Sequence, residues 1–472
     1  MSNQEKYNTL RKAYPEFVYE TYHYNVQPDG LHIVFSFSIG EHRFQPCSFI
    51  PARSFLRFDQ PRETMDALVF NIGMIELISY WKCACPPVVK VRCGALDDTQ
   101  KAFWRKLYWH GLGEFLYING ITATQETFLE IRNEELGMRN GVGHTPPPLR
   151  GTSPNLGEEL EGANSQVSIL NSQFYLVPIG GGKDSVVTLE LLRSARLGKV
   201  VPLIMNPRGA TVGCIQAAGY TMDDVLEIRR TIDPHLLELN AQGFLNGHTP
   251  FSAMLAFYTL LAAQLSGIPA IALSNENSAN ESTVVGTEVN HQYSKSLEFE
   301  NDFRAYVARN LSPDYNYFSF LRPLTELHIA MLFSRYGKYH PVFRSCNVGS
   351  KQDIWCGHCA KCLFAYIILS PFIGPDRLNA IFGKDMLDDI TLRHEFDQLI
   401  GRAETKPFEC VGTVSEVNRA LSMTLARWYA GKALPALLAD YQPNPSLTSM
   451  PPIATEHNLN ESELSLLLNA IQ

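Results

Sequence analysis

One stretch decides the fold of the central part of this chain: Tyr175-Leu176-Val177-Pro178-Ile179-Gly180-Gly181-Gly182-Lys183-Asp184-Ser185-Val186-Val187-Thr188-Leu189-Glu190-Leu191-Leu192. The apolar run at 175–179 predicts a buried strand, the glycines predict a turn, and the run at 186–192 predicts a helix. Glycine lets the backbone take positive φ and bring its amides close to a ligand. Such amides, followed by a helix N-terminus, form a positive concavity that suits phosphate. The alternative is a turn that binds nothing. The spacing is not that of the Walker loop, G-x-x-x-x-G-K-[ST].

Strands and helices alternate after this stretch. Unbroken apolar runs at Val200–Met205 and Ile268–Ser274 predict strands that are buried on both faces. The segment Phe251–Leu265 between them predicts a long helix. This alternation predicts an α/β fold with a doubly wound parallel sheet. Ligands of such sheets bind at the carboxyl ends of the strands, where we expect Asn206 to contact a nucleotide. Glu276 lies at another strand end, where substrate or Mg²⁺ contact and a solvated loop are both open.

The chain divides into four predicted segments. Residues 1–138 mix short strands, such as Leu31–Phe37, with the helix candidates Met65–Tyr80 and Thr99–Trp109, which predicts an α+β domain. A nucleotide-binding fold does not need such a domain, so we expect it to recognise the substrate. Residues 139–168 are rich in Gly, Pro, Ser, Asn and Glu, as expected of a linker or mobile loop. Residues 169–374 form the predicted nucleotide-binding α/β domain. Residues 375–472 form a predicted helical extension, interrupted by a Pro-rich stretch at 442–452.

Composition narrows the class of protein. The net charge of −8 over 472 residues disfavours a surface that binds polyanions along the whole chain, so we expect no nucleic-acid partner. We find no apolar stretch long enough to span a membrane, and the opening residues 1–6 do not resemble a signal peptide. We therefore expect a cytoplasmic enzyme with no membrane partner. In that compartment, ten cysteines suggest thiols or metal ligands before disulfides.

Four of the cysteines form a second motif. Cys346, Cys356, Cys359 and Cys362 are separated by nine, two and two residues, which suits a tetrahedral Zn²⁺ site closed by four sulfurs and therefore structural. A [4Fe–4S] cluster is the rival, but Tyr366 stands where ferredoxin runs carry a further cysteine. Inert thiols are the remaining alternative. The earlier group is expected to consist of small buried side chains: Cys83, Cys85 and Cys93.

The glycine-rich stretch resembles the PP-loop of ATP pyrophosphatases, S-G-G-x-D-S, with Gly180 in place of the first serine. The resemblance implies a PP-loop or HUP-like nucleotide domain that cleaves ATP to AMP and pyrophosphate. It also implies the residues that bind the nucleotide: Gly180, Gly181, Gly182, Lys183, Asp184 and Ser185.

Two families combine this loop with the cysteine motif. The 7-cyano-7-deazaguanine synthases also have a Pro-Leu segment before the cysteines, similar to Arg322–His328 here, but they are near half this length. The fuller resemblance is to the ATP-dependent UDP-N-acetylmuramoyl-L-alanyl-L-glutamate epimerases, the MurL family. Besides the cysteines, it covers four segments: Trp109–Phe115, Ile179–Ser185, Asn246–Pro250 and Ser274–Ser282.

Membership of the MurL family implies inversion of the terminal L-glutamate of a UDP-muramoyl dipeptide, a peptidoglycan precursor, at the expense of ATP with Mg²⁺. Adenylation of the carboxylate removes the negative charge that opposes loss of the α-proton. A general base then takes the proton and an acid returns one on the other face. The loop amides, with Lys183 and Ser185, would hold the pyrophosphate, and Asp184 would act through Mg²⁺ or through the geometry of the loop.

The sequence alone does not identify the groups that transfer the proton. Asp184, Lys183, His248 and Glu276 are the predicted catalytic residues. Further candidates by type are His291, Lys295 and Cys214, although a structural role is favoured for any single one. Three sets complete the candidates: Asn280 for substrate or Mg²⁺, His110 and Glu114 for the substrate cleft or a helix cap, and Arg208, Arg304 and Arg322 for the substrate pyrophosphate. His358 is expected to pack against the cysteine cluster.

Two hypotheses of other classes stand beside the epimerase. A PP-loop ligase or synthase similar to 7-cyano-7-deazaguanine synthase would modify a nucleobase. A nucleotide-binding or zinc-stabilised scaffold without catalysis is disfavoured by the intact sequence Lys183-Asp184-Ser185.

Overall fold

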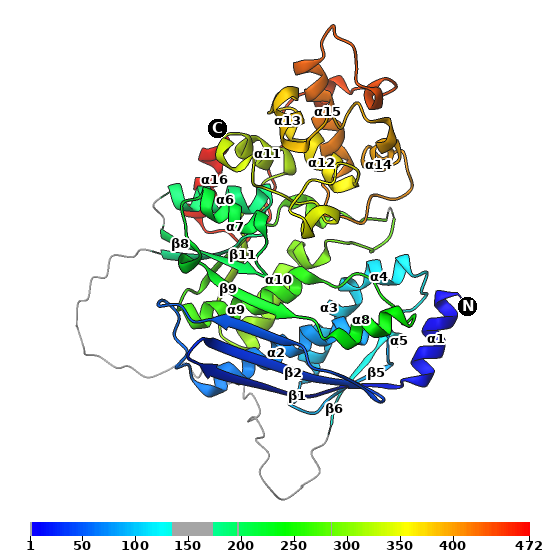
Figure 1. Ribbon diagram of the computed structural model, residues 1–472, viewed down its shortest axis with the longest axis vertical. Coiled ribbons are helices and arrows are strands. Elements are labelled where there is room, and N and C mark those ends of the chain that lie inside the picture. The colour runs from blue at the N-terminus through cyan, green and yellow to red at the C-terminus, as the bar shows by residue number, and fades with distance from the viewer. Residues whose placement is uncertain (1, 135–172, 196–197, 285) are drawn as a thin grey trace, which may run out of the picture.

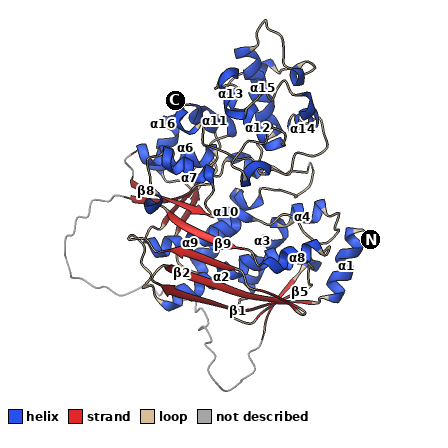
Figure 2. Cartoon of the chain, in the orientation of Figure 1, coloured by secondary structure: helices blue, strands red, loops and turns tan. Residues whose placement is uncertain are grey.

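The computed structural model describes residues 2–134, 173–195, 198–284 and 286–472, and its centre is one eleven-stranded sheet (Figures 1 and 2). The strand order is β11-β10-β7-β8-β9-β4-β2-β1-β5-β6, and β3 pairs with β2 beside this path. The strands run from β1 (Glu16–Gln27), β2 (Gly30–Ile39), β3 (His42–Phe44), β4 (Cys47–Pro51), β5 (Val88–Val91) and β6 (Glu130–Asn133) to β7 (Gln173–Pro178), β8 (Gly198–Met205), β9 (Leu226–Thr231), β10 (Ala270–Leu273) and β11 (Asn316–Ser319).

The second half of the sheet is parallel, as the alternating sequence predicted. Strand β7 pairs in parallel with β8 on one side and with β10 on the other, so the chain changes direction across the sheet at β7. In open α/β sheets a ligand crevice forms at such a change of direction. The loops after β7 and β10, which carry Gly180–Gly182 and Glu276, therefore lie at the same edge.

The first half of the sheet is mainly antiparallel and continues the second. Strand β4 pairs with β9 in antiparallel register, with Ser48 opposite Arg230. Strands β1, β2 and β4 extend the sheet by hairpin pairing, and β5 and β6 add two parallel strands at its far edge. The predicted mixed α/β class is thus confirmed, whereas the narrower nucleotide-domain class and the segment boundaries stay predictions. The predicted linker at 139–168 lies outside the described residues.

Helices cover both faces of the parallel half of the sheet, where α6 (Lys183–Ser194) and α9 (Phe251–Ser266) pack against β7. Side chains alternate along β7, so that Leu176 enters one hydrophobic core while Tyr175 and Val177 enter the other. The helices of the first half and of the crossovers are α1 (Asn3–Ala13), α2 (Arg62–Trp81), α3 (Asp98–Gly111), α4 (Gly113–Ile118), α5 (Gln125–Phe128), α6 (Lys183–Ser194), α7 (Gly209–Ala217), α8 (Pro234–Ala241), α9 (Phe251–Ser266) and α10 (Leu297–Asn310). The predicted helices at 65–80, 99–109 and 251–265 are confirmed as α2, α3 and α9.

Helix α2 is buried on nearly all sides because its sequence is apolar around the whole circumference. One buried carboxyl interrupts this surface: Glu76 pairs with Arg230 of β9 and accepts a hydrogen bond of 2.9 Å from Tyr258 of α9. A buried carboxylate is tolerated only with such partners. Glu76 therefore ties α2, β9 and α9 together beneath the site described below.

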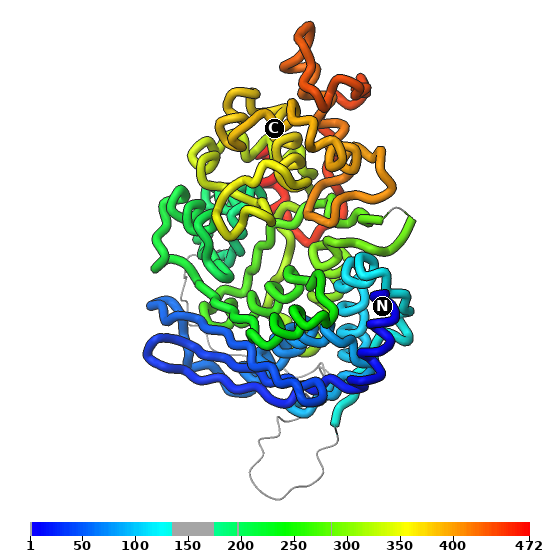
Figure 3. The backbone as a smooth tube through the Cα atoms, turned by 45° about the vertical axis from the view of Figure 1, so that its right-hand side comes forward, coloured from blue at the N-terminus to red at the C-terminus, as the bar shows by residue number. Residues whose placement is uncertain are grey.

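Residues from 375 onward form helices and loops, apart from one isolated β-bridge between Thr405 and Val284. Figures 1 and 3 show most of these helices gathered at the end of the molecule opposite β1 and β2. No described helix combines the length and apolarity needed to cross a membrane. The remaining helices are α11 (Glu326–Ser334), α12 (Ala360–Leu369), α13 (Pro375–Phe382), α14 (Arg393–Leu399), α15 (Val414–Trp428) and α16 (Glu461–Ile471).

Candidate active site

A turn of three glycines, Gly180–Gly182, joins β7 to α6. Gly181 has φ +82°, and a Cβ atom there would lie 3.0 Å from the backbone of Ala210, so only glycine fits without strain. The carbonyl of Gly181 accepts a hydrogen bond of 2.9 Å from the amide of Arg344. The amides of Gly180, Gly181 and Gly182 have no acceptor among the described residues, and no side chain caps α6. Free amides at a helix N-terminus can bind an anion such as a phosphate group.

Beside these amides lies a buried ionic cluster. The Lys183 ammonium donates to Oδ1 of Asp184 at 2.5 Å and contacts Glu326, the first residue of α11. Burial opposes the charge on Lys183, but the two carboxyl groups outweigh it and raise the lysine pKa above its usual value. Burial also opposes the charge on Asp184, yet Lys183, Lys361 and Lys295 hold its pKa below the usual range. Burial raises the pKa of Glu326. The turn therefore combines a fixed cation with carboxyl oxygens, the pairing that a nucleotide and its metal ion require.

Arg322 holds the neighbouring loop in place. Its fully buried guanidinium donates to the backbone carbonyl of Glu276 at 2.7 Å, to the carbonyl of Lys295 and to the carboxylate of Glu300. These bonds join the loop after β10 to the 3₁₀ turn Tyr293–Lys295. Removal of one partner from such a buried network is costly. Arg322 thereby fixes the backbone from which the side chains of Glu276 and Lys295 extend.

Beyond Lys295 a chain of contacting side chains leads away from the glycine turn. Lys295 Nζ lies 3.2 Å from Cys410 Sγ, which lies 3.7 Å from His291 Nε2. The other ring nitrogen of His291, Nδ1, contacts Oε2 of Glu114 on α4. His248 Nδ1 lies 3.1 Å from the same carboxylate oxygen. Four separate segments thus build a Cys–His–Glu arrangement, in which one histidine bridges a thiol and a carboxylate.

The groups in this chain have strongly shifted pKa values. Burial opposes a charge on the Cys410 thiol, but Lys295, His291 and Lys361 lower its pKa to about 5. Burial likewise opposes the imidazolium of His291, while hydrogen bonds to Cys410 and Glu114 raise its pKa to about 9. Burial lowers the pKa of His248 to about 4. Near neutral pH the pair is therefore a Cys410 thiolate beside a His291 imidazolium, and His248 is uncharged.

Glu114, His248 and His291 are also residue types that bind metals, and their ligand atoms lie within 4.8 Å of one another. The Nδ1 atom of His248 and the Nδ1 atom of His291 both lie against the Oε2 atom of Glu114. Two imidazole N–H groups that donate to the same carboxylate oxygen explain why these three side chains lie together, and this explanation requires no metal ion.

The four cysteines of the sequence motif converge on one point. The Sγ atoms lie 3.8 Å apart for Cys346–Cys359, 3.6 Å for Cys356–Cys362 and 3.5 Å for Cys359–Cys362. A tetrahedron with Zn–S bonds of about 2.3 Å has edges of about 3.8 Å. An iron–sulfur cluster binds each thiolate to a different iron and holds the sulfurs farther apart. The thiol geometry therefore fits a single tetrahedral ion.

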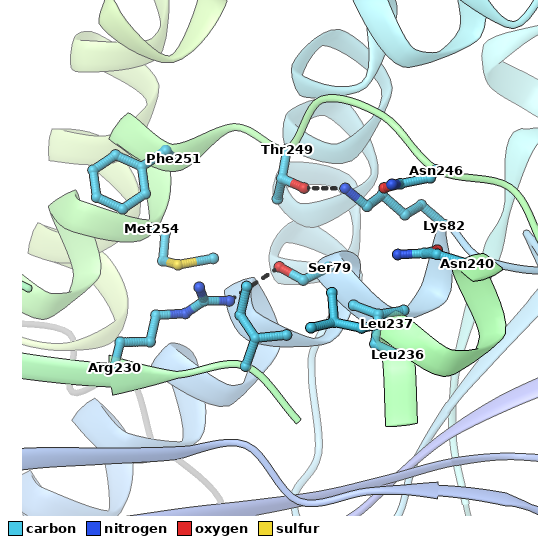
Figure 4. A pocket seen from close by; sticks show the side chains of 11 residues that line it. Ser79, Lys82, Arg230, Leu236, Leu237, Asn240, Asn246, Thr249, Phe251 and Met254 are labelled. Carbon is cyan, nitrogen blue, oxygen red and sulfur yellow. Dashed lines mark hydrogen bonds between the residues drawn. The ribbon is translucent and has the colours of Figure 1, made fainter. Parts of the chain in front are cut away.

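A small pocket is lined in part by Asn246 and Thr249, which lie on either side of His248 in the sequence (Figure 4). It encloses about 230 Å³, and Lys82, which follows the last residue of α2, donates to Thr249 Oγ1 at 2.7 Å in its wall. Burial lowers the pKa of Lys82 to about 8. The apolar part of the lining includes three exposed side chains, Ile232, Leu237 and Phe251. The pocket thus combines apolar surface with a lysine.

Comparisons with known proteins cover most of the chain. The family model described as the MurL N-terminal domain matches residues 8–320, and the model described as the MurL C-terminal domain matches residues 342–447. The chain belongs to the MurL family. This confirms the family that the motifs predicted, and nothing in the comparisons favours the 7-cyano-7-deazaguanine synthases. No solved structure was found to match the chain.

Three curated relatives in the MurL family carry the name UDP-N-acetyl-alpha-D-muramoyl-L-alanyl-L-glutamate epimerase. The protein from Xanthomonas oryzae pv. oryzae is 35% identical over 79% of this chain and 78% of its own. The Micromonospora protein is 35% identical over 81% of this chain and 80% of its own. The Salinispora tropica protein is 33% identical over 81% and 79% respectively.

Several residues predicted from the sequence have structural partners. The side chain of Asn206, which has φ +52°, pairs with both backbone groups of Arg230 at 3.1 and 2.7 Å. Asn280 accepts a hydrogen bond of 2.8 Å from the amide of Leu297. The ring of His110 stacks on Tyr293, with a centroid distance of 4.8 Å. The Nδ1 atom of His358 lies 2.9 Å from the carbonyl of Cys356.

Two of the predicted arginines and Cys214 also have structural positions or partners. Arg304 donates to Asn316 at 2.9 Å, and Arg208 precedes α7 as its N-cap residue. Cys214 Sγ donates to the Gly181 carbonyl at 3.6 Å, and burial raises the pKa of this thiol to about 12. Cys214 is therefore a thiol at neutral pH.

Sequence reasoning missed three groups of this MurL-family site. Glu326 stood in the quoted segment Arg322–His328 but had no assigned role. Lys361 lies inside the cysteine motif, yet its charge acts on Asp184 and Cys410. Cys410 belongs to no local pattern, and only its position among Lys295 and His291 distinguishes it from the other cysteines.

Proposed function

We propose that this protein is an ATP-dependent epimerase that inverts the terminal L-glutamate of UDP-MurNAc-L-Ala-L-Glu to D-glutamate, in the biosynthesis of peptidoglycan precursors. Three relatives that bear this name, each at 33–35% identity over about four fifths of the chain, carry the proposal. The glycine turn with its buried lysine supports the ATP step. We expect the enzyme to act in the cytoplasm, on a small-molecule substrate and without a nucleic-acid or membrane partner.

The ATP step follows from the contacts of the glycine turn. The free amides of Gly180–Gly182 and the Lys183 ammonium would hold the phosphates that leave as pyrophosphate. Asp184, Glu276 and Glu326 supply carboxyl oxygens for Mg²⁺, which would neutralise charge on those phosphates. The Ser185 hydroxyl donates to the Gly182 carbonyl at 3.1 Å, so it would have to rotate before it contacts a phosphate.

Activation explains why an epimerase would consume ATP. The α-proton of a free carboxylate is hard to remove because the resulting carbanion adds charge next to an existing charge. Conversion of the carboxylate to an acyl adenylate removes that charge and lets the carbonyl oxygen accept the electron pair. Hydrolysis then releases AMP and the inverted product. The loop after β10, with Glu276 and Lys295, would lie against this carbonyl.

The remote part of the substrate requires a site of its own. We propose that the pocket around Lys82 accepts one ring of the nucleotide-sugar, because its apolar walls suit a ring and its lysine suits a phosphate. About 230 Å³ is too small for the whole substrate. The segment Asn246–Pro250 joins the two places, since Thr249 lines the pocket and His248 contacts Glu114.

We also propose that Cys346, Cys356, Cys359 and Cys362 bind a structural Zn²⁺. Four sulfurs leave no open coordination position, so the ion would stabilise this part of the fold without touching substrate. Lys361, between two of the ligands, would be positioned by the same loop.

Incubation of the purified protein with ATP, Mg²⁺ and UDP-MurNAc-L-Ala-L-Glu tests the proposal directly. AMP should form together with D-glutamate in the product, and neither should appear when ATP or substrate is omitted. Formation of ADP, or of AMP without inversion, would contradict it. AMP formation with 7-carboxy-7-deazaguanine, without inversion of the dipeptide, would favour the nucleobase alternative.

A further inference from the structure

Cys410 lies between two side chains that can carry a positive charge. Its Sγ atom is 3.2 Å from Lys295 Nζ and 3.7 Å from His291 Nε2. These partners lie more than a hundred residues away in the sequence, so chain proximity does not explain their contact. Cys410 is only half-buried, unlike Cys83 and Cys85, which pack in the core. Cys410 therefore combines charged neighbours with partial exposure of the residue.

The surroundings of Cys410 favour a thiolate–imidazolium pair. Lys295, His291 and Lys361 face the sulfur, and together they outweigh the cost of burying its charge. The neighbouring carboxyl, Glu409, is itself half-buried, and burial raises its pKa to about 7. On the far side of the imidazole, Glu114 fixes the Nδ1–H and so directs Nε2 at the sulfur. Activated nucleophiles and bases commonly lie beside a histidine, and a third group orients that histidine.

We propose that Cys410 and His291 transfer the α-proton, the thiolate as base on one face of the glutamyl α-carbon and the imidazolium as acid on the other. The inference rests on the proposed function, because the acidic carbon is that of the activated glutamyl group. Inversion needs one group without a proton and another with a proton at the same time. The pair supplies both states before substrate binds.

The proton count closes over one turnover. The Cys410 sulfur takes the α-proton, and the C–H electron pair moves into the bond between the α-carbon and the activated carbonyl carbon, whose oxygen becomes an oxyanion. The carbonyl then re-forms while the α-carbon takes the Nε2 proton of His291 on the opposite face. The pair is left as a thiol and a neutral imidazole. The α-carbon enters between Sγ and Nε2, which separate from their contact of 3.7 Å. When the product leaves, the two atoms regain this contact, and the thiol proton passes to Nε2.

Neighbouring groups fit this role less well. Cys214 is a protonated thiol bonded to the Gly181 carbonyl. His248 is uncharged near neutral pH and directs Nδ1 at Glu114. Lys295 holds its proton firmly, because Cys410 and Glu276 raise its pKa despite burial. Its positive charge instead suits stabilisation of the thiolate and of the oxyanion.

Two variants separate proton transfer from activation of the carboxylate. Cys410→Ser should still exchange labelled pyrophosphate into ATP in the presence of substrate, because the glycine turn is intact. Its uptake of solvent deuterium at the α-carbon should fall by about 10²-fold or more. His291→Asn should admit deuterium into the L-glutamyl substrate without inversion, since the base remains but the opposite acid is gone. Cys47→Ser, at an exposed thiol on β4, is the matched control and should retain both activities.

The outcomes distinguish the two proposals. Wild-type protein without pyrophosphate exchange or inversion would remove the proposed function itself. Active wild-type protein together with a Cys410→Ser variant that takes up deuterium at the normal rate would overturn only the inference. Alkylation of the wild-type protein tests the thiolate even if the Cys410→Ser variant does not fold. In wild-type protein iodoacetamide should modify Cys410 rapidly at pH 6, and ATP with substrate should protect it. Slow, unprotected modification would contradict the thiolate.

Discussion

The four-cysteine cluster and the surroundings of Cys410 use the same side chain for opposite purposes. In the cluster each thiol faces other thiols at 3.5 to 3.8 Å, an arrangement that fits one metal ion and leaves no room for a reactant. Cys410 faces an ammonium and an imidazole instead, and the residue is only half-buried. The neighbours of a cysteine therefore decide whether it is a structural ligand or a reactive thiolate.

The two regions are nevertheless joined. Lys361 follows the third cysteine of the cluster, and its charge lowers the pKa of both Asp184 and Cys410. The loop that would bind the metal thus also positions a cation between the glycine turn and the thiolate. Loss of the metal should consequently affect more than stability.

The largest expected effect comes from breaking the cluster. Cys359→Ser removes a central thiol, and structural zinc sites contribute on the order of 10 kcal/mol to folding in small zinc peptides. We expect loss of the bound metal, a markedly lower Tm and loss of AMP formation. Metal analysis and thermal unfolding of the same preparation check this. Iron with a brown colour in the wild-type protein would contradict the zinc assignment, and so would an unchanged Tm in the variant.

The glycine turn should give the second largest effect, on chemistry and not on folding. Asp184→Ala removes one partner of Lys183 but leaves Glu326 beside the ammonium. We expect AMP formation to fall by at least about 10²-fold with little change in Tm. Gly182→Val should have the same outcome, because a branched side chain would cover the free amides. Unchanged ATP cleavage in either variant would exclude the turn as the phosphate site.

The two regions also differ in how far the sequence predicted them. The cluster lies within seventeen residues, so its spacing alone indicated a metal site. The glycine turn and the parallel strands were equally local patterns. Cys410 was missed because its partners, at positions 114, 291 and 295, come together only through the fold. The joining of β4 to β9 was missed for the same reason, since strand pairing between distant segments leaves no local pattern in the sequence.

A third expectation concerns pH and tests the charge state of Cys410. Inversion of the glutamyl α-carbon needs a deprotonated sulfur and a protonated His291 at once. The kcat/KM for inversion should therefore fall as pH drops through about 5, where the thiolate gains a proton, and fall again as pH rises through about 9, where the imidazolium loses one. These limits belong to the interacting pair as a whole. A profile with one limb near the ordinary histidine pKa would show that the two groups are not paired.

The smallest effect should come from the link between the two regions. Lys361→Met removes the cation but none of the cysteines, and its alkyl chain can still pack near Phe364, over which the ammonium lies at 5.3 Å. The metal should remain bound, and the Tm should change little, because a cation–π contact contributes only about 0.5–2 kcal/mol. The acid limb of deuterium uptake should move to higher pH, since Lys361 is one of the charges that lower the pKa of Cys410. Lys295 and His291 remain, so the shift should be smaller than that of Lys295→Met.

Lys432→Met, at an exposed position, is the control. A variant that keeps its metal and the wild-type acid limb would show that the cluster and the thiolate act independently. If the Lys361→Met variant loses its metal, Lys361 instead helps to hold the four cysteine ligands in place.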